Sequence, residues 1–386
     1  MSSSTNSNNT EVSIVIPCLN EADTLENCLL RAKKALLDCT ENGEIIVADN
    51  NSTDDSAKIA LENGAMVVSV KERGYGSALM GGISAAKGKF IVMGDADESH
   101  DLLEIPKFIE KLREGFDIAQ GCRFPAGGGT ISSGSMSFLH RRIGNPFFSL
   151  LVRRWFNAPI HDVYCGFRAF TRQFYDRLDQ RCTGMEFAPE MIIKASFLNA
   201  KIVEVPVTHH PDGRKSHPPH LRTFRDGWRT LRFFLMYSPR WLFLLPGILL
   251  VLAGIIAYLL LVSDVFISSI NGQIQTAMFG SLAILCGYQS ILFAIFTKVF
   301  AISEGLLPVD ERFNRFFEIV NLERGLTVAS ITLFVGFIFL VLGFLQAEIF
   351  FLEFLHFIFI GATMIAVGFQ TILSGFFTSI LGMKRK

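Results

Sequence analysis

Apolar and polar positions follow two different patterns along the 386-residue chain, and the change falls near Pro239. Before it, short runs rich in β-branched residues alternate with segments in which apolar residues recur every three or four positions. After it, stretches of about 20 residues are almost free of charge, which is the length that an α-helix needs to cross a bilayer core. The pattern predicts an α/β domain followed by a membrane domain.

The first half alternates predicted strands with predicted helices. The strands are the apolar runs Val12–Ile16, Ile45–Ala48, Met66–Val70, Phe90–Met93 and Ile118–Gly121. The helices are the periodic segments Leu25–Leu37, Asp54–Asn63, Gly76–Ala86 and Leu102–Leu112. Alternation of this kind is typical of βαβ units, so we expect a mostly parallel sheet. Because such sheets bind ligands at the carboxyl ends of their strands, motifs that directly follow a strand are the first candidates for function.

The second half contains four apolar tracts that we predict to be transmembrane helices. They are Trp241–Val262, Ala277–Phe300, Leu326–Leu345 and Phe354–Leu381. The connection between the second and third tracts carries Lys and Arg, as does the C-terminus, whereas the other two connections carry neither. By the positive-inside rule we expect a multi-pass protein of the cell (inner) membrane, with the α/β domain and both termini on the cytoplasmic side.

A basic amphipathic helix is predicted between the two halves. Its arginines and its apolar residues both recur at helical spacing: Arg222, Arg225, Arg229 and Arg232 beside Leu221, Phe224, Trp228, Leu231 and Leu235. Such a helix lies in the headgroup layer of a membrane, although a helix that packs on the α/β domain shows the same pattern. We therefore expect a disordered tail at 1–10, the α/β domain at 11–211, a juxtamembrane segment at 212–239 and a four-helix membrane domain at 240–386.

Composition excludes several classes of function. Lys and Arg together number 36, as do Asp and Glu, and no basic run is interleaved with aromatic residues, so we expect no nucleic-acid partner. The seven cysteines include no Cys-x-x-Cys pair, which argues against a zinc site and against a disulfide framework. Residues Met1–Thr10 lack the basic start and apolar core of a secretory signal.

Polar motifs follow three of the predicted strands. Pro17-Cys18-Leu19-Asn20-Glu21 ends the first strand and Asp49-Asn50-Asn51-Ser52-Thr53-Asp54 follows the second. Each can face a nucleotide, and each can also be a turn that caps the next helix, for which Ser52 or Thr53 is the candidate. Asp95-Ala96-Asp97 follows the fourth strand. Since alternate residues of an extended segment point the same way, its two carboxylates can bind one Mg²⁺ or Mn²⁺ ion that bridges a pyrophosphate.

Cationic residues are the next candidates for chemistry. Arg123 ends the fifth strand, Arg141 lies near Asn145, and Arg214 and Lys215 lie shortly before the amphipathic helix. Guanidinium groups bind phosphate through two parallel hydrogen bonds, so a phosphate-bearing acceptor that arrives from the bilayer would find ligands here. Taken alone, each of these residues is as consistent with an ordinary surface charge as with a phosphate ligand.

Taken together, the motifs resemble those of the family-two glycosyltransferases, specifically the dolichol-phosphate mannosyltransferase and polyprenyl-phosphate glucosyltransferase branch. The shared elements are Pro-x-x-Asn-Glu, Asp-x-x-Ser-Thr-Asp, Asp-x-Asp, a Gly-x-Arg strand end and Cys165-Gly166-Phe167-Arg168, within Val12 to about Arg232. The resemblance implies a GT-A fold, which is a Rossmann-like α/β domain, for residues 11–211. It also implies a divalent metal, a nucleotide-sugar donor, inverting transfer and a polyprenyl-phosphate acceptor.

The resemblance also implies roles for individual residues. The nucleotide-binding set is Pro17, Leu19, Asn20, Glu21, Asp49, Asn51, Asp95, Ala96 and Asp97. The metal ligands are Asp95 and Asp97, the acceptor-phosphate set is Arg123, Arg141 and Asn145 with Arg214 and Lys215 added, and the catalytic residues are Asp95, Asp97 and Arg123. Two departures leave the metal and the donor open, because Ser99 replaces a family Gln and Asn50 replaces a family Asp. Glu98 or Asp101 can take the place of that Gln.

We therefore expect transfer of one sugar, with UDP-glucose as the first candidate donor, to undecaprenyl or dolichyl phosphate. No catalytic base is required, because a lipid phosphate is largely ionised at neutral pH. Glu186 and Glu190 can contact the acceptor or sugar hydroxyls. Alternatively, they can cap a nearby helix and face solvent.

Three alternatives are weighed against this expectation. GDP-mannose-dependent activity stays open. A processive polysaccharide synthase is disfavoured, because the Gln-x-x-Arg-Trp motif is absent around Arg154-Trp155. A transporter is disfavoured because the spans hold few ionisable residues. Spans of this kind can also pair between subunits, so a homo-oligomer is an open expectation.

Overall fold

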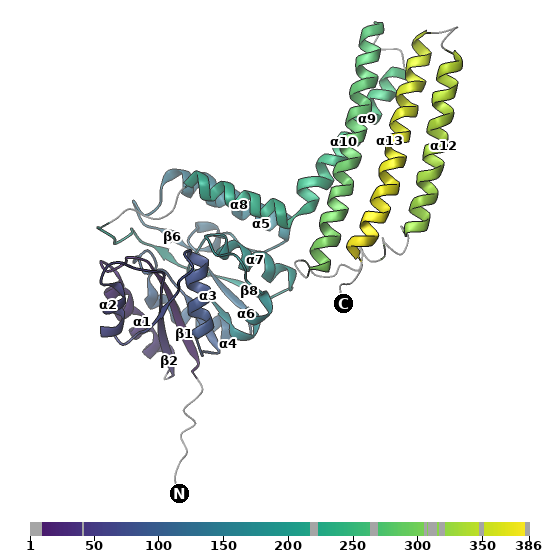
Figure 1. The fold of residues 1–386 in the computed structure, drawn as a ribbon. Coiled ribbons are helices and arrows are strands. Elements are labelled where there is room, and N and C mark those ends of the chain that lie inside the picture. Colours follow the sequence, from purple (N-terminus) through teal and green to yellow (C-terminus); the bar gives the residue numbers. More distant parts are fainter. Residues whose placement is uncertain are drawn as a thin grey trace. The chain divides into compact units, whose positions relative to one another are not determined.

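The structure, a computed structural model, describes residues 10–40, 42–216, 223–262, 269–304, 307, 315, 321–346 and 351–382. It divides into two compact units, Met1–Phe234 and Leu235–Lys386. The boundary between them falls within the segment 212–239 that the sequence singles out as juxtamembrane. Each unit is described separately below, and Figure 1 shows the elements of both.

A seven-stranded sheet with the order β3-β2-β1-β4-β7-β5-β8 forms the centre of the first unit (Figure 1). Its strands are β1 (Val12–Cys18), β2 (Gly43–Asp49), β3 (Met66–Ser69), β4 (Phe90–Met93), β5 (Ile118–Cys122), β7 (Arg168–Thr171) and β8 (Ile202–Pro206). Strand β1 pairs in parallel with β2 on one side and with β4 on the other. A second, two-stranded sheet pairs β6 (Thr130–Ile131) with β9 (Thr208–His209).

Helices follow the first strands as the periodicity predicts. They are α1 (Leu25–Cys39), α2 (Ser56–Glu62), α3 (Tyr75–Ala85) and α4 (Ile105–Arg113), the last preceded by a 3₁₀ turn at Leu102–Glu104. Consecutive residues of β1, including Ile14, Val15 and Ile16, are fully buried, because helices cover both faces of the sheet. The predicted α/β class, the five predicted strands and the four predicted helices are therefore confirmed, with small differences at their ends.

Strand β7 interrupts the parallel order and was not predicted. It lies between β4 and β5 and runs antiparallel to both. Its first residue, Arg168, is fully buried, and its guanidinium donates hydrogen bonds to the backbone oxygens of Ala188 (2.8 Å) and Cys165 (2.6 Å). An arginine in so short a segment hides the strand from a search for apolar runs.

The remaining helices of the first unit follow β6. They are the π-helical turn η3 (His140–Gly144), α5 (Asn145–Phe156), α6 (Arg172–Leu178), α7 (Phe187–Phe197) and α8 (Thr223–Tyr237). Helices α5 and α8 pack together, since the Phe234 ring centroid lies 5.8 Å from that of Phe148 and 5.9 Å from that of Phe156. The predicted amphipathic helix is thus present from Thr223, while Leu221 and Arg222 lie outside the described residues.

The second unit consists of long helices. They are η4 (Arg240–Leu244), α9 (Leu245–Val262), α10 (Ile270–Ser303), α12 (Leu322–Gln346) and α13 (Phe351–Gly382). Four candidate membrane spans are present: Arg240–Leu261, Asn271–Ser303, Leu322–Leu345 and Leu355–Gly382. They coincide with the four predicted tracts and identify a multi-pass membrane protein.

Glycines bring these helices together in pairs. A Cβ atom at Gly254 of α9 would lie 2.6 Å from the backbone oxygen of Gly280 in α10. A Cβ atom at Gly336 of α12 would lie 2.9 Å from the backbone oxygen of Gly361 in α13. Close backbone approach through small residues is a common way for helices to associate in a membrane, where apolar surface alone provides no driving force.

Candidate active site

The sheet order brings three of the sequence motifs to one edge. Because β2, β1 and β4 are parallel neighbours, their carboxyl ends share that edge, and the segments that begin at Leu19, Asn50 and Gly94 follow them there. This is the position at which open α/β sheets bind ligands.

The loops after β1 and β2 are joined by hydrogen bonds. The Asn20 backbone N–H donates to Ser52 Oγ (3.0 Å), and Asn20 Oδ1 accepts from the Thr53 backbone N–H (2.7 Å). Asn20 has a φ of 59°, a left-handed conformation that asparagine tolerates better than most residues. Asp49 Oδ1 accepts from the Ser52 backbone N–H at 3.2 Å. Two of the predicted nucleotide contacts thus also shape the loops that carry them.

Two further residues of these motifs, Asn51 and Pro17, are also held by backbone contacts. The Asn51 amide donates to the Val70 backbone oxygen (3.3 Å), and Pro17 lies in the β1 ladder opposite Ala48. The expectation that Ser52 or Thr53 caps the helix after β2 is wrong, because α2 begins only at Ser56 and its N-cap is Asp55, whose side chain makes no capping hydrogen bond. The Ser56 backbone N–H donates instead to Asp54 Oδ1 at 3.0 Å.

Asp95, directly after β4, is held on two sides. Its Oδ1 accepts from the Tyr75 hydroxyl (3.0 Å), and its Oδ2 lies 3.5 Å from His100 Nδ1. Burial and the neighbouring charge of Asp97 raise the pKa of the Asp95 carboxyl to about 6. A Cβ atom at residue 166 would lie 2.6 Å from Asp95 Oδ2, so Gly166 is required for this placement.

Asp97 is bound differently. Its Oδ1 accepts from the Ser99 backbone N–H (3.0 Å), and its Oδ2 accepts from Arg214 Nη2 (2.8 Å). Burial raises its pKa, but the hydrogen bond from Ser99 and the charge of Arg214 outweigh burial and bring the pKa of Asp97 below its ordinary value. Arg214 Nη1 also donates to Glu21 Oε1 at 3.1 Å, and its Nε donates to Asp212. The Arg214 guanidinium therefore links Glu21, Asp97 and Asp212.

The pair Asp95 and Asp97 fits a hard divalent cation. Both are acidic oxygen donors separated by one residue after β4, and burial together with the charge of Asp97 raises the pKa of Asp95. Burial and the charge of Arg123 lower the pKa of His100 to about 3, so the imidazole beside Asp95 is neutral at pH 7. A cation between the carboxylates would remove their repulsion.

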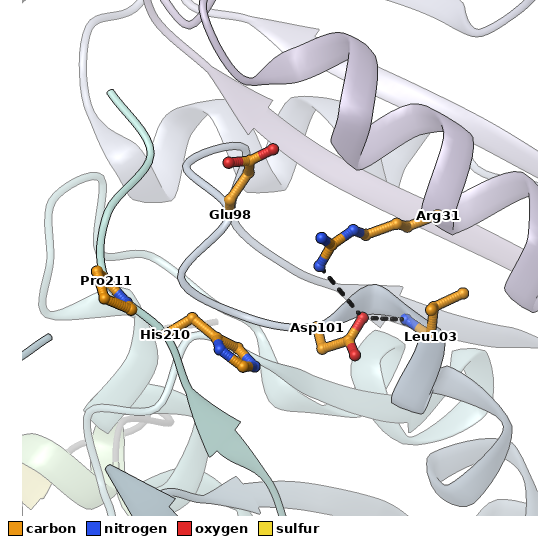
Figure 2. Close-up of a pocket in the computed structure, with 6 residues that line it drawn as sticks. All are labelled: Arg31, Glu98, Asp101, Leu103, His210 and Pro211. Carbon is orange, nitrogen blue, oxygen red and sulfur yellow. Dashed lines mark hydrogen bonds and ion pairs between the residues drawn. The ribbon is translucent and has the colours of Figure 1, made fainter. Parts of the chain in front are cut away.

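The residues that were expected to replace the family Gln lie in a separate hollow. Figure 2 shows this hollow of about 380 Å³, whose lining includes Glu98 and Asp101 but neither Asp95 nor Asp97. Asp101 Oδ1 lies 3.5 Å from Arg31 Nη1 and accepts from the Leu103 backbone N–H at 3.1 Å. The Asp101 carboxylate thus already pairs with Arg31 and accepts a hydrogen bond from the turn that precedes α4.

Arg123, at the end of β5, is paired with Asp162. Its Nε lies 2.7 Å from Asp162 Oδ2 and its Nη2 lies 2.9 Å from Oδ1, a bidentate pair that is almost completely buried. Despite burial, this pairing raises the pKa of Arg123 and lowers that of Asp162. Within the described ranges, Arg123 Nη1 has no hydrogen-bond partner. The charge of Arg123 also lowers the pKa of Asp95.

The predicted acceptor-phosphate residues are not all brought together. Arg141 is exposed on η3, and Asn145 begins α5, where its side-chain nitrogen lies 3.6 Å from Met136 Sδ. Lys215 is also exposed, and its backbone N–H donates to Asp23 Oδ2 at 3.0 Å. Arg214 contacts the carboxylates instead. The structure therefore divides the set: Arg214 contacts Asp97 and the charge of Arg123 acts on Asp95, while Arg141, Asn145 and Lys215 make their contacts elsewhere.

Glu186 and Glu190 have structural contacts. Glu190 is fully buried, lies 2.7 Å from Lys194 Nζ and accepts from the backbone N–H groups of Arg181 and Cys182. Glu186 pairs with Arg229 of α8 at 2.8 Å. Of the two interpretations left open for these residues, the contacts favour a structural role.

Sequence reasoning missed three residues of the site, Tyr75, His100 and Asp162. Tyr75 begins α3 and Asp162 lies in a stretch without regular structure, so no pattern marks either of them. His100 follows Asp97 by three residues, and this short spacing was a signal that could have been used.

Comparisons with known proteins identify the family. Residues 13–179 match the family Glycosyl transferase family 2, and residues 295–382 match the Glycosyltransferase family 2 C-terminal transmembrane region. The first match contains the segments after β1, β2 and β4, and the second covers part of α10 and all of α12 and α13.

Two curated relatives and one solved structure illustrate the similarity. The low-salt glycan biosynthesis hexosyltransferase Agl6 of Haloferax volcanii is 38% identical over 327 residues, 84% of this chain and 77% of that protein. The undecaprenyl-phosphate 4-deoxy-4-formamido-L-arabinose transferase of Klebsiella pneumoniae is 32% identical over 206 residues, 52% of this chain and 59% of that protein. The glucosyl-3-phosphoglycerate synthase of Mycobacterium tuberculosis covers 58% of this chain and 79% of its own with 22% identity and a TM-score of 0.47, too low to transfer a residue role. The chain therefore belongs to glycosyltransferase family 2, as a multi-pass membrane enzyme with a GT-A catalytic domain.

Proposed function

We propose that this enzyme transfers a single hexose, with inversion, from a nucleotide-sugar to the phosphate of a membrane polyprenol, and that the donor is UDP-glucose. The observation that carries the proposal is the Asp95–Asp97 pair at the carboxyl edge of the sheet, in a chain that also has four candidate membrane spans. The names of the relatives support it, because one is a hexosyltransferase and the other is an undecaprenyl-phosphate transferase.

The donor would bind above β1, β2 and β4. Pro17, Leu19, Asn20, Glu21, Asp49 and Asn51 would line its nucleoside end, and Asp95, Ala96 and Asp97 would lie at its diphosphate. Mg²⁺ or Mn²⁺ held by Asp95 and Asp97 would supply charge neutralisation for the departing nucleoside diphosphate. Tyr75 fixes the orientation of the Asp95 carboxylate through its hydroxyl, and the Ser99 backbone N–H does the same for Asp97.

The acceptor phosphate would act as the nucleophile without a protein base. Its second pKa of about 6 leaves it largely ionised at neutral pH. Arg123, which pairs with Asp162 through Nε and Nη2, would hold this phosphate in line with the sugar. Arg141, Asn145 and Lys215, which the structure does not bring beside Arg123, would contact the phosphate only if the acceptor itself brought them together. Rate acceleration would then come from charge stabilisation and positioning.

The reaction would take place at the cytoplasmic face of the cell (inner) membrane. Lys298 lies near the end of the second span and Arg324 near the start of the third, so basic residues flank the connection between them. The positive-inside rule places this connection, and with it the catalytic domain and both termini, in the cytoplasm.

Product identification tests the proposal. Full-length protein in lipid nanodiscs is incubated with undecaprenyl phosphate and, in separate reactions, UDP-glucose, other UDP-hexoses or GDP-mannose, with and without EDTA. We expect a lipid-linked monosaccharide from UDP-glucose that is lost with EDTA and restored by Mn²⁺. A product from GDP-mannose alone would replace the donor assignment, and a polymer or the absence of any lipid product would overturn the reaction.

A further inference from the structure

Asp162 holds Arg123, but no regular structure holds Asp162. Its carboxylate accepts hydrogen bonds from Arg123 Nε (2.7 Å), from Nη2 (2.9 Å) and from the Arg123 backbone N–H (3.2 Å). Asp162 is fully buried, and the stretch 157–167 between α5 and β7 contains neither helix nor strand. The direction of the Arg123 guanidinium therefore depends on whatever fixes this irregular stretch.

Side chains from two neighbouring strands fix Asp162. Gln120 of β5 and Glu204 of β8 are partners in the parallel pairing of these strands, so their side chains leave the same face of the sheet. Glu204 Oε1 accepts from the Asp162 backbone N–H (3.3 Å), and Gln120 Nε2 donates to the Asp162 backbone oxygen (3.1 Å). Both backbone polar groups of Asp162 are thus satisfied by the side chains of one cross-strand pair.

Glu204 also holds the residue before Asp162. Its Oε1 accepts from the His161 backbone N–H (2.5 Å), and its Oε2 lies 2.6 Å from His161 Nδ1. The Glu204 side chain is only 12% exposed, and a Cβ atom at Gly127 would lie 3.1 Å from Glu204 Oε2, so the turn η2 (Pro125–Gly127) covers the carboxylate. Hydrogen bonds to a carboxylate are stronger than those between neutral groups, so its three contacts to consecutive residues form a firm anchor.

These contacts run from the sheet to a group of the candidate site. Glu204 fixes the backbone of Asp162, and the Asp162 carboxylate fixes the backbone and the guanidinium of Arg123. A displacement of about 1 Å at a group that positions a reactant can lower a rate by about 100-fold. A residue that touches no substrate can therefore influence the reaction through this series of contacts.

We propose that Glu204 is a positioning residue for the acceptor. Together with Gln120 it fixes Asp162, and through Asp162 it sets the direction of the Arg123 guanidinium. The link from Glu204 to Arg123 rests on the contacts above. Its effect on the acceptor rests on the proposed function, in which Arg123 holds the phosphate of a polyprenol.

Steady-state kinetics of full-length variants in nanodiscs test the proposal, with undecaprenyl phosphate and UDP-glucose varied in turn. Glu204→Ala removes all three contacts. Glu204→Asp keeps the charge but shortens the side chain by one methylene, and it carries the test if the Ala variant does not fold. Glu204→Gln keeps an oxygen for the two backbone N–H groups and an amide that can donate to His161 Nδ1.

Asp117→Ala is the matched control. Asp117 Oδ2 accepts from the Lys201 backbone N–H at 2.8 Å, so it is also a carboxylate that links β5 to β8 through a backbone group. This contact lies at the amino ends of the two strands, whereas Arg123 follows the carboxyl end of β5. Loss of the Asp117 contact should therefore disturb the strand pair without reaching Arg123.

We expect E204A and E204D to raise the KM for undecaprenyl phosphate, by about tenfold in E204A, while the KM for UDP-glucose stays the same. E204Q and D117A should keep both constants of the wild type. An unchanged KM for undecaprenyl phosphate in E204A and E204D would overturn the proposal. So would an equal rise of both constants, or the same rise in D117A, because either result would indicate a general effect on the fold.

Thermal unfolding in detergent tests the link to Arg123 without sugar transfer. The double variant E204A/R123A should lower Tm by less than the sum of the two single shifts, because both substitutions act on one network of contacts. E204D takes the place of E204A if the latter does not fold. Additive shifts would overturn the link. Non-additive shifts in a protein that makes no lipid-linked sugar would support the link and overturn the proposed function.

Discussion

Replacement of Arg214 by Gln is expected to strengthen metal binding while it weakens sugar transfer. Arg214 Nη2 lies 2.8 Å from Asp97 Oδ2, an oxygen that the proposed metal site needs, and Nη1 lies 3.1 Å from Glu21 Oε1. The Arg214 side chain is only 9% exposed, so solvent screens these contacts weakly. The contact with Arg214 therefore competes with a cation for Asp97 Oδ2.

The size of the effect follows from the contact that is lost. A hydrogen bond between charged groups contributes about 1.5–3 kcal/mol. If cation binding must break the bond from Arg214 to Asp97, its removal improves the metal dissociation constant by about 10- to 100-fold, since 1.4 kcal/mol corresponds to a factor of ten. The loss of a positive charge beside Glu21 and Asp212 acts in the same direction.

Titration with Mn²⁺, in which electron paramagnetic resonance detects the free ion, measures this constant in full-length protein without nucleotide. Arg113→Gln is the matched control, because Arg113 is also paired with a carboxylate, Glu11 at 2.7 Å, but lies on the exposed surface. We expect tighter Mn²⁺ binding in R214Q, no change in R113Q, and slower transfer in R214Q because the guanidinium no longer positions Asp97 and Glu21. Unchanged or weaker Mn²⁺ binding in R214Q would refute the idea that Arg214 competes with the metal.

Three further substitutions test the site. Asp97→Ala should abolish transfer to polyprenyl phosphate without a change in melting temperature, and retained turnover would remove the metal assignment. Gly166→Ala places a Cβ atom 2.6 Å from Asp95 Oδ2, so kcat should fall by about 100-fold as the carboxylate is displaced by an ångström or so; unaltered kcat would show that the carboxylate position is not critical. Arg123→Ala leaves the carboxylate of Asp162 buried without its counter-charge and should lower the free energy of unfolding by about 3–5 kcal/mol, measured by denaturation in detergent; wild-type stability would contradict the importance of this pair.

The fold could be predicted wherever local pattern decides the structure. The apolar runs predicted within β1, β2 and β4 are buried, and long uncharged tracts became the spans. Strand β7 could not be recognised, because Arg168 contradicts the pattern of a buried strand. Its charge is accommodated by backbone oxygens of Cys165 and Ala188, which only the folded chain brings within reach.

The candidate site could likewise be predicted from the sequence only in part. The alternating pattern predicts a parallel sheet, in which motifs at strand ends share one edge, but the order that makes β2, β1 and β4 neighbours comes from the structure. The contact between Asp97 and Arg214 spans 117 positions of the chain, and Arg214 lies in a segment without regular structure, so no periodicity could have indicated it. Whether the residues of this site bind donor, metal and acceptor stays a prediction that the substitutions above address.

The glycine contacts between the membrane helices imply that tolerance to mutation in this half of the chain is inverted relative to a water-soluble protein. Large apolar residues on the outside of α9 and α12 face lipid, and one can replace another at little cost because lipid accommodates any shape. Gly254 and Gly336 cannot be replaced without separating two backbones. A separated pair would not be driven together again by the hydrophobic effect, since the bilayer is as apolar as the side chains themselves. The smallest side chains of the membrane half should therefore be its least replaceable.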